Sequence, residues 1–393
     1  MSSEVEPDLS RIKATLAELV AFDTQNPPGR ELEAAQWLRQ VMAAMGFSAA
    51  VTDLMPGRSN VVGVLDNGPG PAFAFNTHID VVPAGGGWSH DPFMLREKDG
   101  RLYGRGACDA KGPMAAMLEA MRWLAGNRAR WSGTLLGVFV ADEEASSRGA
   151  KAYVQGRPKI DICIIGEPTS CTTYSAHKGS MRPLVRVHGR TAHSGMPDLG
   201  VNAIIKSASL MRLVAEEHAR IKAVQHALVG SPSLTITRAQ AGVADNVGPD
   251  LCELLLDRRM IPGEDEAAVK AAMADLVARA AAEAGTPMEI AEFRPTTGGA
   301  TETAPDHPVV VACQAACRHH HGHATPLSGF QGGCDLVHFR SVGAQGVVLG
   351  PGALDVAHQP DEYVPVRELA MAAAIYRDVA LNMLGGGGDA RIR

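Results

Sequence analysis

The sequence lacks a hydrophobic run long enough to span a bilayer. Within its 393 residues no stretch approaches the roughly 18 apolar residues that a transmembrane helix needs. Residues 1–9 do not show the basic and then apolar pattern of a secretion signal. Blocks of Lys or Arg are also missing and the formal net charge is only -6, so neither nucleic acid nor a membrane is an expected partner. These absences favour a cytoplasmic protein that acts on a small molecule.

Two further kinds of chemistry are unsupported. The Gly-x-Ser-x-Gly elbow of serine hydrolases does not occur. The 7 cysteines, an odd number, lie mostly in apolar or motif segments, which favours reduced thiols over a disulfide framework. The run from Cys313 and Cys317 to His323 contains residues that can bind zinc, but no second ligand pair follows at a usable spacing. The alternative for this run is a helix end that enters a polar loop.

The chain does contain two alternating kinds of apolar segment. Helical spacing is found over 9–22, 32–45 and 114–124, and short apolar runs are found at 72–75, 135–140 and 160–165. Short apolar strands between helices predict an α/β domain with a mostly parallel, buried sheet and helices on both faces.

From about residue 180 the pattern changes. A strand (184–188), a helix (201–219), two strands (234–237 and 251–257), a helix (264–284) and a strand (288–293) follow one another. This order is that of the ferredoxin-like motif. After Arg294 an apolar strand (346–349) and a helix (366–383) return the chain to the first domain. We therefore predict a discontinuous domain of residues 1–179 and 295–393, and an inserted ferredoxin-like α+β domain of residues 180–294. The glycine-rich tail from Gly385 is expected to be disordered.

Acidic residues and a histidine follow three of the predicted parallel strands. His78 and Asp80 follow the first, Asp142-Glu143-Glu144 the second and Glu167 the third. Because ligand sites of open α/β sheets lie beyond the C-terminal strand ends, these side chains are expected to meet in one crevice. So many carboxylates repel one another, and a bound cation is the usual compensation.

Each of these residues also has an ordinary structural explanation. A single histidine at a strand end is commonly hydrogen-bonded, and paired glutamates are commonly solvated. Asp109, in the glycine-rich turn before the helix near Met114, could be a helix N-cap. Together they favour a metal site, because the spacing His78-x-Asp80 also allows Asp80 to accept the free ring N–H of His78 and fix its tautomer.

Six segments, in this order along nearly the whole chain, resemble motifs of the M20 family of metallopeptidases and deacylases. They are Asn76–Pro83, Trp88–Phe93, Arg105–Gly112, Asp142–Glu144, Gly166–Thr169 and Ala357–Tyr363. Ala176–Gly179 and Gly350–Gly352 are similar to segments of the family's amino-acid deacetylases. The chain departs from related deacylases at Gly332-Gly-Cys-Asp335, where those proteins often carry Thr-Asp or Ser-Asp.

The resemblance implies a site for two metal ions. Asp109 is expected to bridge the ions and to precede a cis peptide bond. The remaining expected ligands are His78 and Glu167 for one ion, and Glu144 and His358 for the other. Asp80 would orient His78. Glu143 is implied as the general base, and adjacent residues at a strand end point in different directions, so Glu144 can bind metal while Glu143 faces a water.

The implied activity is an amide hydrolase that removes an acyl group from a small N-acyl amino acid, with N-acetylornithine as the expected substrate. Zinc is the expected metal, with cobalt or manganese as substitutes. The alternatives are other M20 activities, namely removal of succinyl from succinyl-diaminopimelate, hydrolysis of N-carbamoyl amino acids or of dipeptides, and a non-catalytic binding protein on the same fold.

The resemblance also implies roles for the inserted domain as a lid and as the contact of a homodimer. His193 is expected to reach the active site of a partner subunit and stabilise the developing oxyanion. Asn246 and Arg258 are expected to contact the substrate, and an arginine fork suits a substrate carboxylate.

Overall fold

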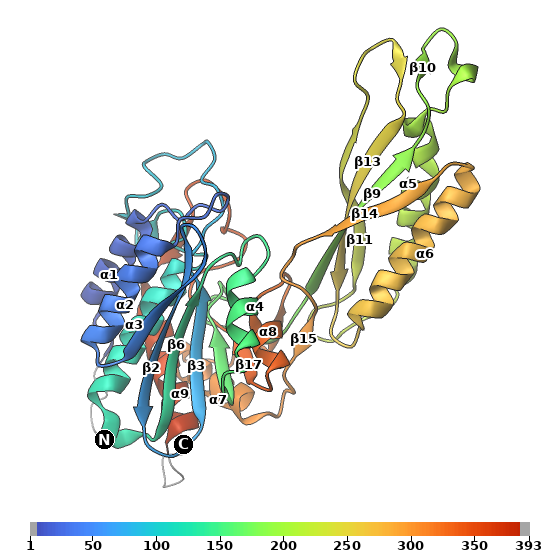
Figure 1. Ribbon diagram of the computed structural model, residues 1–393. Coiled ribbons are helices and arrows are strands. Elements are labelled where there is room, and N and C mark those ends of the chain that lie inside the picture. Colours follow the sequence, from blue (N-terminus) through green and yellow to red (C-terminus); the bar gives the residue numbers. More distant parts are fainter. Residues whose placement is uncertain (1–5, 386–393) are drawn as a thin grey trace. The chain divides into compact units, whose positions relative to one another are not determined.

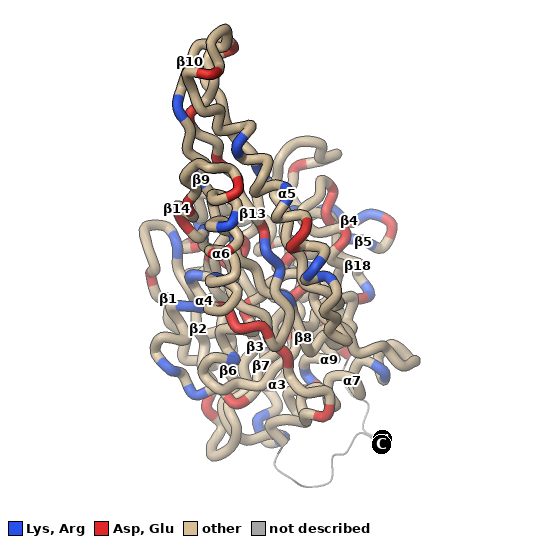
Figure 2. Tube along the Cα trace, turned by 90° about the vertical axis from the view of Figure 1, so that its right-hand side faces the viewer, with Lys and Arg blue, Asp and Glu red and all other residues tan. Residues whose placement is uncertain are grey.

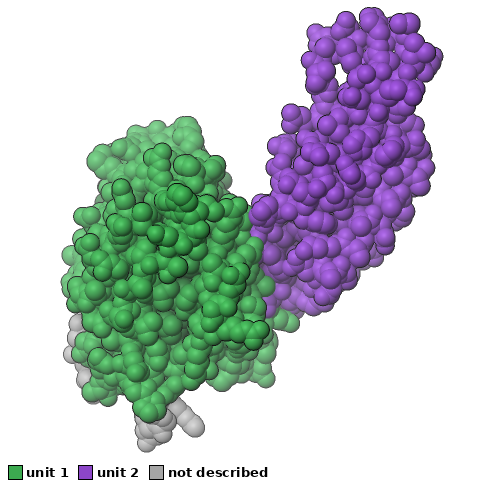
Figure 3. Space-filling model, in the orientation of Figure 1, with its two compact units in different colours: residues 1–176, 302–330, 334–393 green, residues 177–301, 331–333 purple. Residues whose placement is uncertain are grey.

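A computed structural model describes residues 6–385 of the chain (Figure 1). The described residues form two compact units, one of residues 6–176, 302–330 and 334–385 and one of residues 177–301 and 331–333 (Figure 3). The chain passes from the first unit to the second after Ala176 and returns at Glu302, and residues 331–333 also belong to the second unit. The predicted disordered tail lies, beyond Gly385 itself, outside the described residues.

A nine-stranded sheet runs through the first unit in the order β1-β2-β6-β3-β7-β17-β8-β15, with β16 beside β8. Its strands are β1 (Ser48–Met55), β2 (Arg58–Asn67), β3 (Ala72–His78), β6 (Gly133–Val140), β7 (Ile162–Ile165), β8 (Tyr174–His177), β15 (Thr301–Glu302), β16 (Ser328–Phe330) and β17 (Gln345–Val348). Strands β6, β3, β7 and β17 are parallel. The pairs β1–β2, β2–β6 and β17–β8 are antiparallel. The predicted parallel sheet is thus confirmed at the centre, and antiparallel strands extend it.

Helices cover both faces of this sheet, as predicted. One face packs against α1 (Leu9–Ala21), α2 (Leu32–Ala44), α3 (Lys111–Gly126), α7 (Pro308–His321) and α9 (Val366–Leu384), and the other against α4 (Arg148–Gln155) and α8 (Leu336–Ser341). Strand β3 illustrates why, because Phe73 and Phe75 enter the first core whereas Ala72 and Ala74 enter the second. Strand side chains alternate between faces, and a strand buried on both faces is apolar throughout.

A small antiparallel sheet joins two segments of the first unit that are distant in sequence. Its strand order is β18 (Tyr363–Pro365), β5 (Arg101–Tyr103) and β4 (Arg96–Lys98). Tyr363 pairs with Tyr103 in this sheet. The segment that precedes Asp109 is thereby attached to the segment that follows His358.

The second unit has the predicted ferredoxin-like order. Its elements are β9 (Gly179–His188), α5 (Ala203–Ile221), β11 (Ser233–Ala241), β13 (Leu251–Met260), α6 (Glu266–Ala284) and β14 (Met288–Arg294). The sheet order is β11-β13-β9-β14, and every neighbouring pair is antiparallel. The N-cap side chains of Asn202 and Asp265 accept backbone N–H groups of the first turns of α5 and α6, which begins both helices. A two-stranded pair, β10 (Ala192–His193) and β12 (Val247–Gly248), completes the unit.

Candidate metal centre

The three strand ends that carry the predicted ligands are neighbours in the sheet. Strand β3 lies between β6 and β7, and His78 at its end is paired with Val140 at the end of β6. Asn76 is paired with Ile165 at the end of β7. Since all three strands run parallel, the residues that follow them emerge at the same edge, as the sequence predicts.

Asp109 lies between two histidines. Its Oδ1 is 3.2 Å from His78 Nε2, and its Oδ2 is 3.2 Å from His358 Nε2. The peptide bond from Asp109 to Ala110 is cis, as the family resemblance implied. Asp109 and His78 are buried, and the His358 side chain is 49% exposed. One carboxylate oxygen for each imidazole is the arrangement that a carboxylate bridging two ions requires.

Glu144 and Glu167 extend this cluster on either side. Glu144 Oε2 lies 3.1 Å from His358 Nε2, and Glu167 Oε2 lies 4.0 Å from His78 Nε2. Among the described residues, the groups whose possible ligand atoms all lie within 4.8 Å of one another are His78-Asp109-Glu144 and His78-Glu143-Glu167. The structure therefore brings all five predicted metal ligands and Glu143 into one place.

The charges in this cluster shift the pKa values of its members. Burial opposes ionisation of Asp109, but hydrogen bonds from His358 and His78 hold the pKa of Asp109 below its ordinary range. The hydrogen bonds with Asp109 and Glu144 raise the pKa of His358 to about 11. Burial and the nearby charge of Asp109 raise the pKa values of both Glu144 and Glu167. The carboxylates of the cluster thus carry more negative charge than its two histidines can neutralise.

These donors fit a pair of divalent cations. Zinc binds imidazole nitrogen and carboxylate oxygen at about 2.0 to 2.2 Å, so two ligand atoms on one ion lie about 3.3 Å apart. The contacts of Asp109 with both histidines, and of Glu144 with His358, have this spacing. Cations would also supply the positive charge that the carboxylates lack.

Asp80 holds the site together in a different way from that predicted. The Nδ1 atom of His78 faces the backbone carbonyl of Asp80 at 2.8 Å, whereas the nearest Asp80 carboxylate oxygen is 3.8 Å away. The carboxylate instead accepts the backbone N–H groups of Glu143 at 3.1 Å and Glu144 at 3.3 Å. Asp80 therefore orients His78 through its main chain and positions both glutamates through its side chain.

A buried polar network that the sequence did not reveal lies behind these glutamates. Asn26 Nδ2 donates to Asp80 at 2.8 Å and to Asp142 at 3.0 Å. Arg58 donates to the same Asp142 oxygen at 2.7 Å and pairs with Glu31 at 2.5 Å. Asp142 has a left-handed backbone, with φ 69°, at the turn that carries Glu143. Arg58 and Asn26 thus fix the turn on which the predicted base lies.

Asp335 is a second residue near the site without a predicted role. It is 1% exposed, and neither of its carboxylate oxygens accepts a well-aligned hydrogen bond from the described residues. Burial raises the pKa of Asp335 to about 6, although the hydroxyl of Ser147 lies close enough to favour the charged form. The motif Cys334-Asp335 therefore contributes one more buried acid to this part of the first unit.

The three predicted site residues of the inserted domain lie in the second unit and do not form one group. His193 on β10 is exposed and pairs with Val247, next to Asn246, whose carbonyl accepts the Ser194 N–H at 2.9 Å. Arg258 on β13 is only 3% exposed, and its guanidinium is paired with Glu264. The carboxylate of Glu264 therefore already binds the guanidinium of Arg258, which was expected to bind the substrate.

The neighbouring arginine differs. Arg259 has a side chain that is 30% exposed, and its Nε donates to Asp257 at 2.7 Å. Burial and the positive charge of Arg259 lower the pKa of Lys178.

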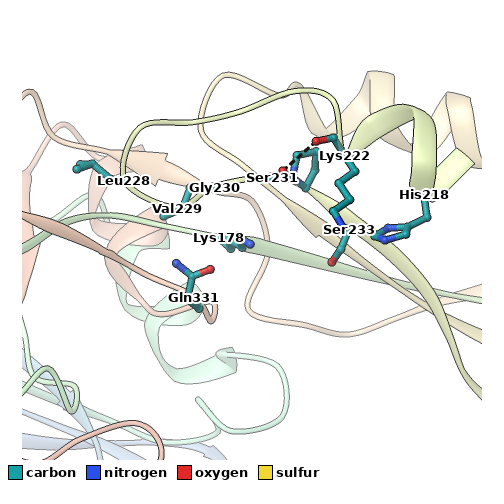
Figure 4. Close-up of a pocket in the computed structure, with 10 residues that line it drawn as sticks. Lys178, His218, Lys222, Leu228, Val229, Gly230, Ser231, Ser233 and Gln331 are labelled. Atoms are coloured by element: carbon teal, nitrogen blue, oxygen red, sulfur yellow. Dashed lines mark hydrogen bonds between the residues drawn. The ribbon is translucent and has the colours of Figure 1, made fainter.

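Lys178 also lines a pocket of about 410 Å³ in the second unit, together with His218, Lys222 and residues 228–233 (Figure 4). His218 and Lys222 lie at the C-terminal end of α5, where cations stabilise the helix dipole, so their presence needs no ligand.

The cysteine and histidine run near residue 320 does not form a metal site in the described residues. Cys313 and Cys317 are buried in the apolar core. His320 pairs with Asp378 at 2.7 Å, and His321 faces the carbonyl of Cys171 at 3.1 Å. These residues form the end of helix α7, which Gly322 closes with a left-handed φ of 74°.

Comparison with known proteins identifies the family. Residues 74–382 match the model of peptidase family M20/M25/M40. The chain belongs to this family. Its M20 relatives include an acetylornithine deacetylase of Myxococcus xanthus, which is 34% identical over 392 residues, or 96% of this chain and 99% of the relative. An acetylornithine deacetylase of Vibrio campbellii is 32% identical over 338 residues, or 84% of this chain and 85% of the relative.

Solved M20 structures share the fold at low sequence identity. The metallo-carboxypeptidase Sso-CP2 from Sulfolobus solfataricus has a TM-score of 0.79 and 18% identity, covering 95% of this chain and 99% of that chain. The protein YXEP of Bacillus subtilis, a dinuclear metal-binding M20 peptidase, has a TM-score of 0.72 and 18% identity, covering 96% and 98%. The chain is an M20 hydrolase of amide bonds, similar to acetylornithine deacetylases. No helix within residues 6–385 is long and apolar enough to cross a membrane.

Proposed function

We propose that this M20 hydrolase uses two zinc ions to remove the acyl group from a small N-acyl amino acid, and that N-acetylornithine is its substrate. The observation that carries the proposal is the placement of Asp109 between His78 and His358, 3.2 Å from each. Asp109, His78 and Glu167 would bind one ion, and Asp109, Glu144 and His358 the other. When bound, such ions lower the pKa of a water molecule and polarise the scissile carbonyl.

Glu143 is the proposed general base. Glu143 is buried beside His78 and Glu167, and burial and the charge of Glu167 raise the pKa of Glu143 well above its ordinary value in the metal-free chain. Glu143 would take the proton of the attacking water and return it to the amine as the C–N bond breaks. The Asp80 carboxylate holds the N–H of Glu143 at 3.1 Å, which restricts the direction from which the base acts.

The choice of N-acetylornithine is supported by the two acetylornithine deacetylase relatives, which match at least 84% of this chain. Such a substrate carries a carboxylate, and Arg259 is better suited to meet it than Arg258. The reason is that Glu264 holds Arg258 in a buried pair, whereas among the described residues Arg259 is bonded only through Nε to Asp257. Asn246 stays the proposed partner for a polar group of the substrate.

The test is a substrate panel with zinc-loaded and cobalt-loaded enzyme. N-Acetylornithine, N-succinyl-diaminopimelate, an N-carbamoyl amino acid and a dipeptide are compared by kcat/KM. We expect N-acetylornithine to exceed the others by at least about tenfold, because the base and ligands are shared and only the pocket discriminates. A higher kcat/KM for the succinyl compound would move the enzyme to the desuccinylase branch, and no turnover of any compound would favour a binding protein.

We also propose that the enzyme works in the cytoplasm as a homodimer formed through its second unit. The described residues of that unit expose several large apolar side chains near β10 and the start of α5. They are Met196 (55% exposed), Leu199 (65%), Ile204 (48%) and Ile205 (70%). These four side chains lie within the ten residues 196–205, and contiguous exposed apolar patches are typical of protein interfaces. The lysines and arginines of the chain are scattered over both units, so the charge pattern does not point to a nucleic-acid partner (Figure 2).

A further inference from the structure

Three of the six family motifs contain a residue that the proposed reaction does not use. These residues are Trp88, Arg105 and Glu362. Glu362 is the most unusual, because it is a carboxylate with 1% exposure only four positions after His358. It belongs to neither group of converging ligand atoms among the described residues. An ionised side chain buried to this extent needs a specific set of partners.

Both carboxylate oxygens of Glu362 are used, and their partners lie at Asp109. Oε1 accepts the backbone N–H of Cys108 at 2.9 Å and the backbone N–H of Asp109 at 3.0 Å. Oε2 accepts a hydrogen bond from Arg105 Nη1. Hydrogen bonds from a backbone N–H to an ionised carboxylate are about twice as strong as neutral ones. Glu362 therefore fixes two consecutive peptide groups, the one that ends in the N–H of Cys108 and the one that ends in the N–H of Asp109.

Arg105 binds the Glu362 carboxylate, and Trp88 packs against Arg105. The Arg105 guanidinium lies 5.1 Å from the centre of the Trp88 ring and donates to the carbonyls of Pro83 and Ala84 at 3.3 Å each. Trp88 Nε1 donates to the same Ala84 carbonyl at 2.8 Å. Pro83 lies three residues after Asp80, whose carbonyl faces His78. Arg105 thus connects the loop after His78 to Glu362.

The backbone of Glu362 completes the connection. Its carbonyl accepts the Gly104 N–H at 3.0 Å, beside the pairing of Tyr363 with Tyr103. Glu362 consequently contacts the segment of Asp109 through both its side chain and its main chain, and it lies on the same segment as His358. These hydrogen bonds therefore link the segment of Asp109 to the segment of His358.

We propose that Glu362 is a positioning residue for the metal centre. It holds the bridging carboxylate of Asp109 at a fixed distance from His358, and Arg105 and Trp88 keep Glu362 in place. This inference rests on the proposed two-metal site. It gives a role to three motif residues that are not predicted ligands, and two of them lie in the motifs that carry the ligands Asp109 and His358.

The test is the substitution Glu362→Gln, which keeps the size of the side chain. The amide replaces one acceptor by a donor, so it opposes either Arg105 or the N–H groups of Cys108 and Asp109. Zinc is titrated into metal-free protein in competition with a chromogenic chelator, and the visible spectrum of the cobalt-loaded protein is recorded. We expect the second zinc ion to bind about 10- to 100-fold more weakly than in the wild type. The cobalt spectrum should change, and kcat should fall while KM stays within about twofold.

Glu119→Gln is the matched control. Glu119 on α3 is also a carboxylate of low exposure, paired with Arg11 at 2.7 Å and accepting the backbone N–H of Asp8 at 3.2 Å. Its partners belong to no segment that carries a metal ligand. This variant should bind two zinc ions with wild-type affinity, even if its thermal unfolding temperature falls as much as that of Glu362→Gln.

Two results would overturn the proposal. One is a Glu362→Gln protein that binds both zinc ions with wild-type affinity and has an unchanged cobalt spectrum. The other is an equal loss of zinc affinity in Glu119→Gln, which would make the effect one of general stability. A wild-type protein that binds fewer than two zinc ions would instead reject the proposed metal centre, and the positioning role with it.

A second variant covers the case in which Glu362→Gln does not fold. Glu362→Asp keeps the charge that Arg105 needs but is one methylene shorter, so it cannot reach Arg105 and both N–H groups together. The same weakening of the second zinc ion is expected here. Wild-type zinc affinity in Glu362→Asp would contradict the proposal, because only the reach of the carboxylate differs.

Discussion

Glu143 and Glu144 are adjacent in the sequence, yet their carboxylates have different surroundings. Glu144 contacts His358 at 3.1 Å, whereas Glu143 belongs to the group formed with His78 and Glu167. The backbone N–H groups of both residues are held by one acceptor, the carboxylate of Asp80. A shared anchor with diverging side chains is what the proposed roles require, in which Glu144 binds a cation and Glu143 carries a proton.

The substitution Glu143→Ala tests this division of roles. We expect kcat to fall by about 10²- to 10⁴-fold, because the water loses its proton acceptor and the amine its proton donor. Zinc content, measured by elemental analysis, should remain at two ions per chain, since Glu144 and the other ligands are untouched. Unchanged kcat would remove Glu143 from the mechanism, and loss of both ions would make it a ligand instead of a base.

At the scale of elements, the apolar pattern predicted strands of very different burial, from β3, which is buried throughout, to β14, which has no buried residue. The strands β3, β6 and β7, the helix α3 and the elements of the ferredoxin-like motif were found where predicted, although β9 begins five residues before its predicted start and β11 ends four residues after its predicted end. The hairpin of β1 and β2 was not predicted. No residue of β1 is fully buried, whereas β2 is largely buried and contains the apolar run Val61–Leu65, so exposure explains only the omission of β1. That omission also hid Arg58, which pairs with Asp142 at a separation of 84 residues.

The site was predictable as a set of residue types, but its contacts were not. The ligand residues could be read from the motifs and from their places at strand ends. Whether Asp80 meets His78 through its carboxylate or its carbonyl depends on the backbone direction after the strand, which no residue spacing encodes. The choice between Arg258 and Arg259 similarly depends on which face of β13 each residue takes and on a contact with Glu264, six residues away.

Replacing each arginine of β13 by Met separates binding from stability. Arg259→Met should lower kcat/KM for N-acetylornithine by about 10- to 100-fold, mainly through KM, because a charge-assisted hydrogen bond to the substrate carboxylate is lost. Arg258→Met should leave KM near its wild-type value. It should reduce the free energy of unfolding by about 3 kcal/mol, because Glu264 loses its partner. Denaturant unfolding and steady-state kinetics measure both effects, and a large rise of KM in Arg258→Met alone would restore the original assignment.

On the scale of the whole molecule, the fold is shared with M20 structures at 18% identity, so the fold alone does not choose the substrate. The surface of the second unit is more informative. Its exposed apolar side chains include Ile205 and Leu199, which a monomer would leave in water. They lie close in sequence to His193, which is exposed on β10 and has no predicted metal ligand beside it in its own unit. A role for His193 in a partner subunit would account for both features.

Subunit mixing tests that role. Inactive His193→Ala and Glu143→Ala proteins are combined, subunits are exchanged under mild denaturation, and exchange is verified by native mass spectrometry of differently tagged chains. If His193 acts across the dimer, a mixed dimer contains one site with both Glu143 and His193 intact, so statistical exchange should restore about a quarter of wild-type kcat. If His193 acts within its own chain, no site of the mixed dimer is complete. The Glu143→Ala subunit has His193 but no base, and the His193→Ala subunit has Glu143 but no His193. Activity would then stay at the level of the separate variants despite complete exchange, and the proposed contribution of a partner subunit would be wrong.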